Sequence, residues 1–257
     1  ANLGSAMPYR SMINEWRAEA LGLPPARRLA DPFSVGGQEL PVLYAFSETV
    51  VPRPADWPTE GVHVTGYWFL DSEAGDALDS ELVDFLEAGD PPVYIGFGSL
   101  VGKDPAATTR TVLDAVAEAG VRAVIASGWG GLTAADAPEA VHIIDRAPHD
   151  RLFPRCAAVV HHGGSGTTAA GLRAGVPSVI CPFFGDQSFW GAQVSRIGAG
   201  PEPIAQKQLS AERLVVARET AVGDPGMRAR ARSVGEALRS EDGVATAVGI
   251  IEAAAAG

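Results

Sequence analysis

From residue 91 onward, short apolar runs alternate with stretches of helical character. We expect strands at five of these runs, residues 93–97, 121–126, 141–144, 157–161 and 178–181. Short buried strands that alternate with helices of about ten residues are typical of βαβ units. The sequence therefore predicts an α/β fold built on a Rossmann-like, doubly wound parallel sheet.

Glycine and proline mark where the helices of this region begin and end. We expect helices over residues 104–119, 167–174 and 189–197, each followed by a glycine that suits a helix C-terminus. Residues 210–256 predict two or three further C-terminal helices and no strand.

The first seventy residues lack this regular alternation. Residues 12–21 predict a helix, because Ile13, Trp16 and Ala20 are spaced to share one face. Residues 41–46 and 62–69 each predict a short strand. Between them, residues 51–58 contain too many prolines for a helix or a central strand, and predict a linker.

Composition narrows the class of function. Asp and Glu number 31 against 20 Lys and Arg, which gives a formal net charge of −11. Sequence-independent binding of nucleic acid needs a basic surface, so we expect no nucleic-acid partner. No apolar run reaches the roughly 18 residues of a membrane span, and no signal segment opens the chain. We therefore expect a soluble, cytoplasmic protein, in which Cys156 and Cys181 are reduced, buried thiols.

The segment 161–168, HHGGSGTT, follows an expected strand and opens an expected helix. Its three glycines let backbone N–H groups approach a ligand closely, and a helix N-terminus adds free donors and the positive end of a dipole. We predict an anion site here, where a diphosphate would contact the N–H groups of residues 165–168, the hydroxyls of Ser165 and Thr167, and the imidazole of His162. The alternative is a glycine-rich turn whose histidines are ordinary polar residues.

Commoner motifs do not match the sequence. Residues 98–103 have three residues between the glycines, where a P-loop has four, and Asp104 follows where Ser or Thr should hold magnesium. Residues 96–102 are one residue too long for the dinucleotide fingerprint. Residues 163–166 lack the second glycine of a hydrolase nucleophile elbow. The two adjacent histidines should point to opposite faces of a strand, so we do not expect them to form a metal pair.

Three other loops lie at the same expected edge of the sheet, where open α/β sheets bind ligands. Asp186 and Gln187 follow the strand at 178–181 and suit contacts with sugar hydroxyls, although Asp186 equally suits the N-cap of the next helix, and both roles can coexist. Trp129, among glycines, and Arg146 offer stacking faces for a planar base. The alternative for Trp129 is packing within its own domain.

Six motifs occur in the order found in the C-terminal half of family 1 glycosyltransferases, which the chain resembles. They are GFGS at 96–99, SGW at 127–129, RAPH at 146–149, HHGGSGTT at 161–168, RAGVP at 173–177 and PFFGDQSFW at 182–190. The sequence is most similar to the branch of sterol 3-beta-glucosyltransferases and bacterial natural-product glycosyltransferases. The resemblance covers residues 41–251 and implies a GT-B architecture, in which this half binds a nucleoside-diphosphate sugar, usually a UDP-sugar.

The resemblance implies a role for each matching residue. Diphosphate contacts are implied for Ser99, His162, Gly164, Ser165, Gly166 and Thr167, base contacts for Trp129, Arg146, Ala147 and Pro148, and hexose contacts for Asp186 and Gln187. It implies no metal and no cofactor, because the helix end and the histidine stabilise the leaving diphosphate. Arg146 replaces a tryptophan of related plant enzymes, which transfers base stacking to Trp129. Ala170 replaces their ribose-binding glutamate and leaves the ribose contact unassigned.

The resemblance also implies that the chain is part of a longer enzyme. Residues 1–66 would be a remnant of the N-terminal acceptor domain with the interdomain linker, and residues 67–257 the nucleotide-sugar donor-binding domain. The catalytic general base is expected in the missing N-terminal half, so no catalytic residue is assigned and the chain alone is expected to be inactive.

The implied reaction is transfer of a hexose, with inversion, from a UDP-sugar such as UDP-glucose to a lipophilic alcohol such as a sterol or natural product. The expected partners are the UDP-sugar, the lipophilic acceptor, and either a peripheral membrane or an N-terminal acceptor domain. Two alternatives stay open: a non-catalytic nucleotide-sugar-binding subunit of a split glycosyltransferase, and a UDP-sugar epimerase.

Overall fold

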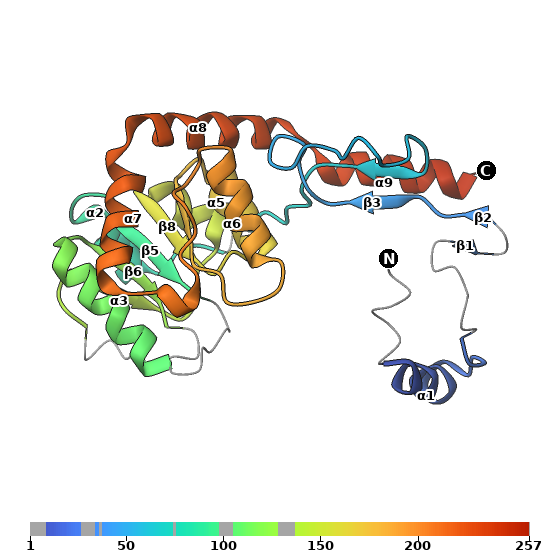
Figure 1. Cartoon of the computed structure of the whole chain (residues 1–257), viewed down its shortest axis with the longest axis horizontal. Helices are drawn as coiled ribbons and strands as arrows, with labels where there is room; N and C mark the ends of the chain where they lie inside the picture. Colours follow the sequence, from blue (N-terminus) through green and yellow to red (C-terminus); the bar gives the residue numbers. More distant parts are fainter. Residues whose placement is uncertain are drawn as a thin grey trace.

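The computed structural model describes residues 9–26, 34–35, 38–73, 76–97, 105–127 and 137–256. One sheet dominates it, with five parallel strands in the order β7-β6-β5-β8-β9 (Figure 1). Its strands are β5 (Val93–Gly96), β6 (Ala123–Ala126), β7 (Val141–Ile144), β8 (Ala158–His161) and β9 (Ser178–Ile180). Because the chain starts at β5, runs outward to β7 and then returns to β8, the sheet is doubly wound. The predicted fold class is confirmed.

Helices cover both faces of this sheet, because successive strand residues point to opposite faces. On one face, Val93 and Ile95 are buried in a cluster with side chains of α3 (Pro105–Ala119) and α7 (Ala211–Gly223). On the other face, Tyr94 is buried in a cluster with side chains of α2 (Ser80–Glu87), α4 (His149–Leu152) and α5 (Ser165–Ala174). The body of the molecule is therefore a three-layer α/β arrangement.

A third apolar cluster joins α5 to two more helices. Leu172 of α5 is fully buried against Trp190 and Val194 of α6 (Gln187–Arg196) and Leu238 of α8 (Pro225–Ser240). This contact fixes α5 between the sheet and α8. The N-terminus of α5 is thereby held in place at the edge of the sheet.

Each helix for which the sequence analysis gave bounds is present, with ends within two residues of the expected ones. α5 starts two residues before its expected first residue, and α6 likewise starts early, at Gln187. The sequence analysis did not predict α2. This helix has an Asp79 N-cap, whose carboxylate accepts the Glu81 N–H at 2.9 Å, and it buries Leu82 and Leu86 on one face.

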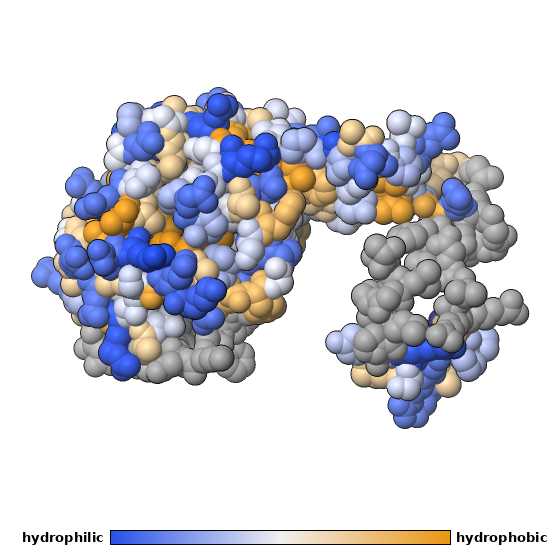
Figure 2. Space-filling model, in the orientation of Figure 1, coloured by the Kyte–Doolittle hydropathy of each residue, from blue (hydrophilic) through white to orange (hydrophobic). Residues whose placement is uncertain are grey.

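Most of the first part of the chain lies outside this body, although Val50 is fully buried in the cluster that contains Leu172. β3 (Val42–Tyr44) and β4 (Val62–Val64) pair in parallel as a separate two-stranded sheet, and residues 51–58 between them form neither helix nor strand. α9 (Gly243–Ala256) leaves the body and lies beside them, so the three elements form an arm (Figure 1). Figure 2 shows orange, hydrophobic patches along this arm, in keeping with the exposed Val244, Val248 and Ile251 of α9.

A helix and a short two-stranded ladder precede the arm. α1 (Arg10–Leu21) buries none of its residues, and β1 (Ser34–Val35) pairs with β2 (Gln38–Glu39) in an antiparallel ladder. Over the described ranges, no helix combines the length and apolar character needed to cross a membrane.

The arm meets the body at a close crossing of two chain segments. A β-carbon at Gly243 would overlap the carbonyl oxygen of Tyr67, so the start of α9 needs glycine there. Next to it, the Ser47 hydroxyl donates to Glu241 Oε1 at 2.5 Å. Burial, with a smaller contribution from Glu241, raises the pKa of Tyr67, whose ring is almost fully buried. These contacts attach the arm to the turn between α8 and α9.

Candidate functional site

The strand order reverses between β5 and β8, which are neighbours at the centre of the sheet. Ligands of open α/β sheets bind outside the carboxyl ends of the strands at such a switch point. The residues that follow β8 and β9 come together there, since the backbone of Gln187 lies against Gly163. Two of the sequence-predicted residues, Ser99 and Trp129, lie outside the described residues.

The turn between β8 and α5 is built on glycine. Gly163 has a φ of +90°, and a β-carbon there would lie 2.6 Å from Cγ2 of Ile180 and 3.0 Å from the carbonyl oxygen of Gln187. Both the backbone conformation and the available space therefore require glycine. Because Gly163 has no side chain, the turn can lie in close contact with the start of α6.

The N-terminus of α5 carries no side-chain cap. Gly164 is its N-cap residue, and its carbonyl oxygen accepts the Thr168 N–H at 2.9 Å. The N–H groups at the start of a helix have no acceptor within the helix, so those of residues 165–167 remain available. Gly166 is exposed, and nothing lies within 4 Å of where its β-carbon would be. Together with Ser165 and Thr167, this turn forms an open site for an anion.

His162 lies directly over this helix end. A β-carbon at Gly164 would come within 2.5 Å of His162 Nε2, so the imidazole covers the N-cap. The ring is half-buried, and its Nδ1 has no hydrogen-bond partner among the described residues. Burial lowers the pKa of His162, although the nearby Asp186 carboxylate acts in the opposite direction. The imidazole is therefore neutral at pH 7 and presents one N–H donor.

His161 has a structural position instead. It is fully buried, and its Nδ1 accepts the N–H of Gly163 at 3.1 Å. Burial, with smaller contributions from the imidazoles of His162 and His149, lowers its pKa to about 3. The neutral ring therefore stabilises the glycine turn from inside the protein, while His162 faces the open side.

Asp186 and Gln187 both accept hydrogen bonds from their own loop and helix. The Asp186 carboxylate accepts the indole N–H of Trp190 at 2.9 Å and makes no side-chain bond to the backbone at the start of α6. Gln187 is buried, and its Oε1 accepts the N–H groups of Phe183 at 2.7 Å and Phe184 at 3.1 Å. The exposed Asp186 side chain faces solvent beside His162, whereas Gln187 keeps only its amide NH₂ for a ligand.

The loop between β7 and α4 carries the other predicted contacts. Arg146 is exposed, while Ala147 and Pro148 are half-buried and line an open cavity of about 1140 Å³ beside the segment that precedes α2. At the start of the loop, the Ser127 hydroxyl donates to Asp145 Oδ1 at 3.0 Å. The structure thus places these three residues on one loop, separate from the α5 turn.

His149 lies between this loop and the α5 turn, and the sequence analysis assigned it no role in binding. Its ring stacks on Phe153 with a centroid distance of 4.3 Å. Burial lowers its pKa; Asp150 acts in the opposite direction and His162 lowers it further. The imidazole of His162 therefore acts electrostatically on His149. The sequence could have pointed to His149 as a residue of the site, because it directly follows Pro148 in the RAPH motif.

Comparison with known proteins agrees with this architecture. The family model of the erythromycin biosynthesis protein CIII-like C-terminal domain matches residues 110–253, more than half of the chain. A sterol 3-beta-glucosyltransferase of Arabidopsis thaliana is 43% identical over 240 residues, which is 93% of this chain and 37% of the relative. A sterol 3-beta-glucosyltransferase of Emericella nidulans is 44% identical over 248 residues, which is 92% of this chain and 17% of the relative. The chain thus spans well under half of these relatives.

Solved structures share the fold at lower sequence identity. The glycotransferase of kitacinnamycin superposes with a TM-score of 0.70 at 19% identity, covering 96% of this chain and 62% of the other. Glycosyltransferase VinC, solved with dTDP, gives a TM-score of 0.65 at 22% identity, covering 95% and 59%. The fold, the matched family model and these relatives show that the chain belongs to the family of erythromycin biosynthesis protein CIII-like C-terminal domains, the C-terminal half of GT-B family 1 glycosyltransferases.

Proposed function

We propose that this chain is the donor-binding part of an inverting glycosyltransferase that transfers a hexose from a UDP-sugar, UDP-glucose above all, to a lipophilic alcohol such as a sterol or natural product. The observation that carries the proposal is the uncapped N-terminus of α5, with His162 Nε2 against Gly164. Free N–H groups at a helix N-terminus favour a diphosphate. The names of the relatives support a glucosyl donor and a sterol-type acceptor.

In the proposed complex, each part of the donor has its own group of residues. The turn at 164–167 and His162 contact the diphosphate, and residues 146–148 contact the base. The exposed carboxylate of Asp186 and the amide NH₂ of Gln187 contact the hexose hydroxyls. Ser99 and Trp129, which lie outside the described residues, belong to the proposed diphosphate and base contacts. The proximity of His162 and Asp186 supports this order, because the hexose follows the diphosphate in the donor.

The proposed reaction is a displacement at the anomeric carbon. The acceptor oxygen forms a bond to this carbon on the side opposite the diphosphate, whose bond to the carbon breaks and whose oxygen keeps the electron pair. The acceptor proton passes to a general base, which we expect in the N-terminal half of the whole enzyme. The N–H groups of α5 and the neutral His162 N–H stabilise the leaving charge, so the proposal requires no metal ion and no cofactor.

We propose that residues 67–257 are the donor-binding domain and that residues 1–66 belong to the acceptor half and the linker. The five-stranded sheet, confined to residues 93–180, supports this division, since β3 and β4 pair separately in the arm. The chain alone would then bind the donor with little turnover, in the cytoplasm, and would need an acceptor-binding half for transfer. A peripheral membrane is the second proposed partner, because it would supply a lipophilic acceptor.

Isothermal titration of the chain with UDP and UDP-glucose tests the proposal. We expect both to bind, with and without EDTA, and His162→Ala to weaken both by about tenfold, since it removes a hydrogen bond to a charged group. His63→Ala, on β4 in the arm, is the matched control and should bind as the wild type. Unaltered binding in His162→Ala would contradict the diphosphate assignment. An epimer formed without acceptor would instead indicate an epimerase, and a co-purifying acceptor chain would indicate a split enzyme.

A further inference from the structure

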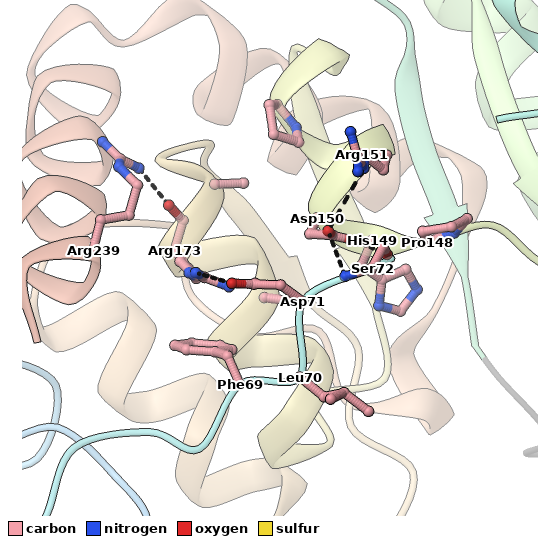
Figure 3. Close-up of a pocket in the computed structure, with 13 residues that line it drawn as sticks. Phe69, Leu70, Asp71, Ser72, Pro148, His149, Asp150, Arg151, Arg173 and Arg239 are labelled. Carbon is pink, nitrogen blue, oxygen red and sulfur yellow. Dashed lines mark hydrogen bonds and ion pairs between the residues drawn. The ribbon is translucent and has the colours of Figure 1, made fainter. Parts of the chain in front are cut away.

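A second open cavity, of about 800 Å³, lies beside the loop that carries Pro148 (Figure 3). Its wall is formed by residues 69–72, which we call the strap, by residues 148–151, and by side chains of α5 and α8. The strap follows β4 in the chain and so leads from the arm into the body. Its contacts connect elements that are distant in sequence.

The first anchor of the strap is Arg173, in the last turn of α5. Its guanidinium donates from both terminal nitrogens to the two carboxylate oxygens of Asp71, and lies 4.4 Å from the centroid of the Phe69 ring. Hydrogen bonding to Arg173 is the main cause that lowers the pKa of Asp71, so this carboxylate is ionised at pH 7. Arg239 of α8 donates to the carbonyl oxygen of Arg173. The strap is thereby attached to α5.

The second anchor is Asp150, in the first turn of α4. Its carboxylate accepts the Ser72 hydroxyl at 2.6 Å and the Ser72 N–H at 3.1 Å, and Figure 3 shows these residues beside each other at the end of the strap. Burial acts to raise the pKa of Asp150, but the two hydrogen bonds from Ser72 act against it and the pKa is lowered. The ionised carboxylate is therefore a strong acceptor for the strap.

The loop between β7 and α4, together with the first turn of α4, has few other polar contacts. Over the described ranges, its side-chain hydrogen bonds to other elements come from Ser127 at its start and from Ser72 at its end. Leu152 and Phe153 beyond it are fully buried, and Ala147 and the His149 ring pack against the same core, so apolar contacts hold the inner side of the loop. The strap adds the polar contacts that connect the exposed side of this loop to α5.

We propose that Asp150 is a positioning residue: through Ser72 and the strap, it holds the loop at 146–148 at a fixed distance from α5. This inference rests on the proposed function, in which the loop contacts the base and the N-terminus of α5 contacts the diphosphate. A nucleoside diphosphate spans both elements and benefits from their preset spacing. Inorganic pyrophosphate contacts α5 alone and gains nothing from it.

The test compares the affinities of the whole chain for UDP, dTDP and inorganic pyrophosphate. In Asp150→Ala we expect about tenfold weaker binding of the nucleotides, because the loop is no longer held where it contacts the base, and pyrophosphate binding within about twofold of the wild type. Asp150→Asn, which keeps an acceptor for the Ser72 N–H, should recover most of the loss. Adding Ser72→Ala to Asp150→Ala should weaken binding no further, because both changes remove the same contact.

Glu87→Ala is the matched control, because it removes an exposed ion pair with Arg155 at 3.3 Å, just beyond α4. Its nucleotide affinities should equal those of the wild type. Equal UDP affinity in Asp150→Ala and the wild type would overturn the inference, as would an equal loss of pyrophosphate binding. A wild-type chain that binds pyrophosphate but neither nucleotide would refute the proposed function itself, and the inference with it.

Discussion

His162 and Gly164 are matched to each other: the imidazole occupies the space that a side chain at position 164 would fill, with Nε2 only 2.5 Å from where a β-carbon would be. The backbone of Gly164 does not itself require glycine, because its φ of −60° and ψ of 143° are open to any residue. Glycine is needed at this position so that the histidine can cover the N-terminus of α5.

Gly164→Ala should therefore weaken donor binding by moving the imidazole. We expect UDP affinity to fall by about tenfold, the same loss as removal of the His162 hydrogen bond. Isothermal titration gives the affinity. Gly249→Ala is the control, because Gly249 lies in α9 with open space around it. Wild-type affinity in Gly164→Ala would show that the histidine does not contact the diphosphate.

The affinity for UDP-glucose should rise as the pH is lowered from about pH 8 to about pH 5.5, across the ordinary pKa range of histidine. Burial lowers the pKa of His162 in the free protein. A bound diphosphate favours the charged imidazolium, so binding takes up a proton and becomes tighter at low pH. UDP-glucose is used because its diphosphate does not titrate in this range. His162→Gln should flatten the profile, and an unchanged profile would contradict the prediction.

His161 should make the protein less stable in mild acid. Its pKa is about 3 in the folded protein and about 6.5 in the unfolded chain, so between these values the unfolded state binds the extra proton. The free energy of unfolding should therefore fall as the pH drops from about 6.5 toward 3. His161→Asn keeps an acceptor for the Gly163 N–H without titrating. Urea unfolding at several pH values should give it a shallower pH dependence, and an equal slope would contradict this assignment.

Gln187→Ala should destabilise the fold. The change leaves the N–H groups of Phe183 and Phe184 without their acceptor, which should cost about 2 kcal/mol or more. The free energy of unfolding in urea measures this cost. Gln208→Ala, at an exposed glutamine, should change it by less than about 0.5 kcal/mol. If the two variants are equally stable, the loop after β9 does not depend on Gln187.

Asp186→Asn should weaken the binding of the sugar part of the donor without changing the binding of its nucleotide part. Asparagine can still accept the Trp190 N–H, so the fold should be retained, but the negative charge available to hexose hydroxyls is lost. We expect about tenfold weaker binding of UDP-glucose and unchanged binding of UDP. Competition titrations measure both affinities. An equal loss for the two ligands would indicate that Asp186 acts through the loop and not through the hexose.

Much of the fold follows from local patterns. The expected strand at 141–144 coincides with β7, because so short a run suits a strand better than a helix. α2 was missed although Leu82 and Leu86 have helical spacing behind Asp79, because one short helix gives a weak pattern. For the site, the position of His162 at the end of a strand was predictable, whereas the Gln187 bonds to its own loop were not. Those bonds depend on how a turn closes in three dimensions.

The sequence by itself determined the alternating strands and helices, the glycine turn before α5 and the family to which the chain belongs, since these depend on residue types at short spacing. Only the tertiary structure decided which histidine is buried and which is open, and that the strap joins Asp71 to Arg173 and Ser72 to Asp150. These partners lie 102 and 78 residues apart. No local pattern specifies such a pair, because closure of the sheet and the packing of its helices bring the two segments together.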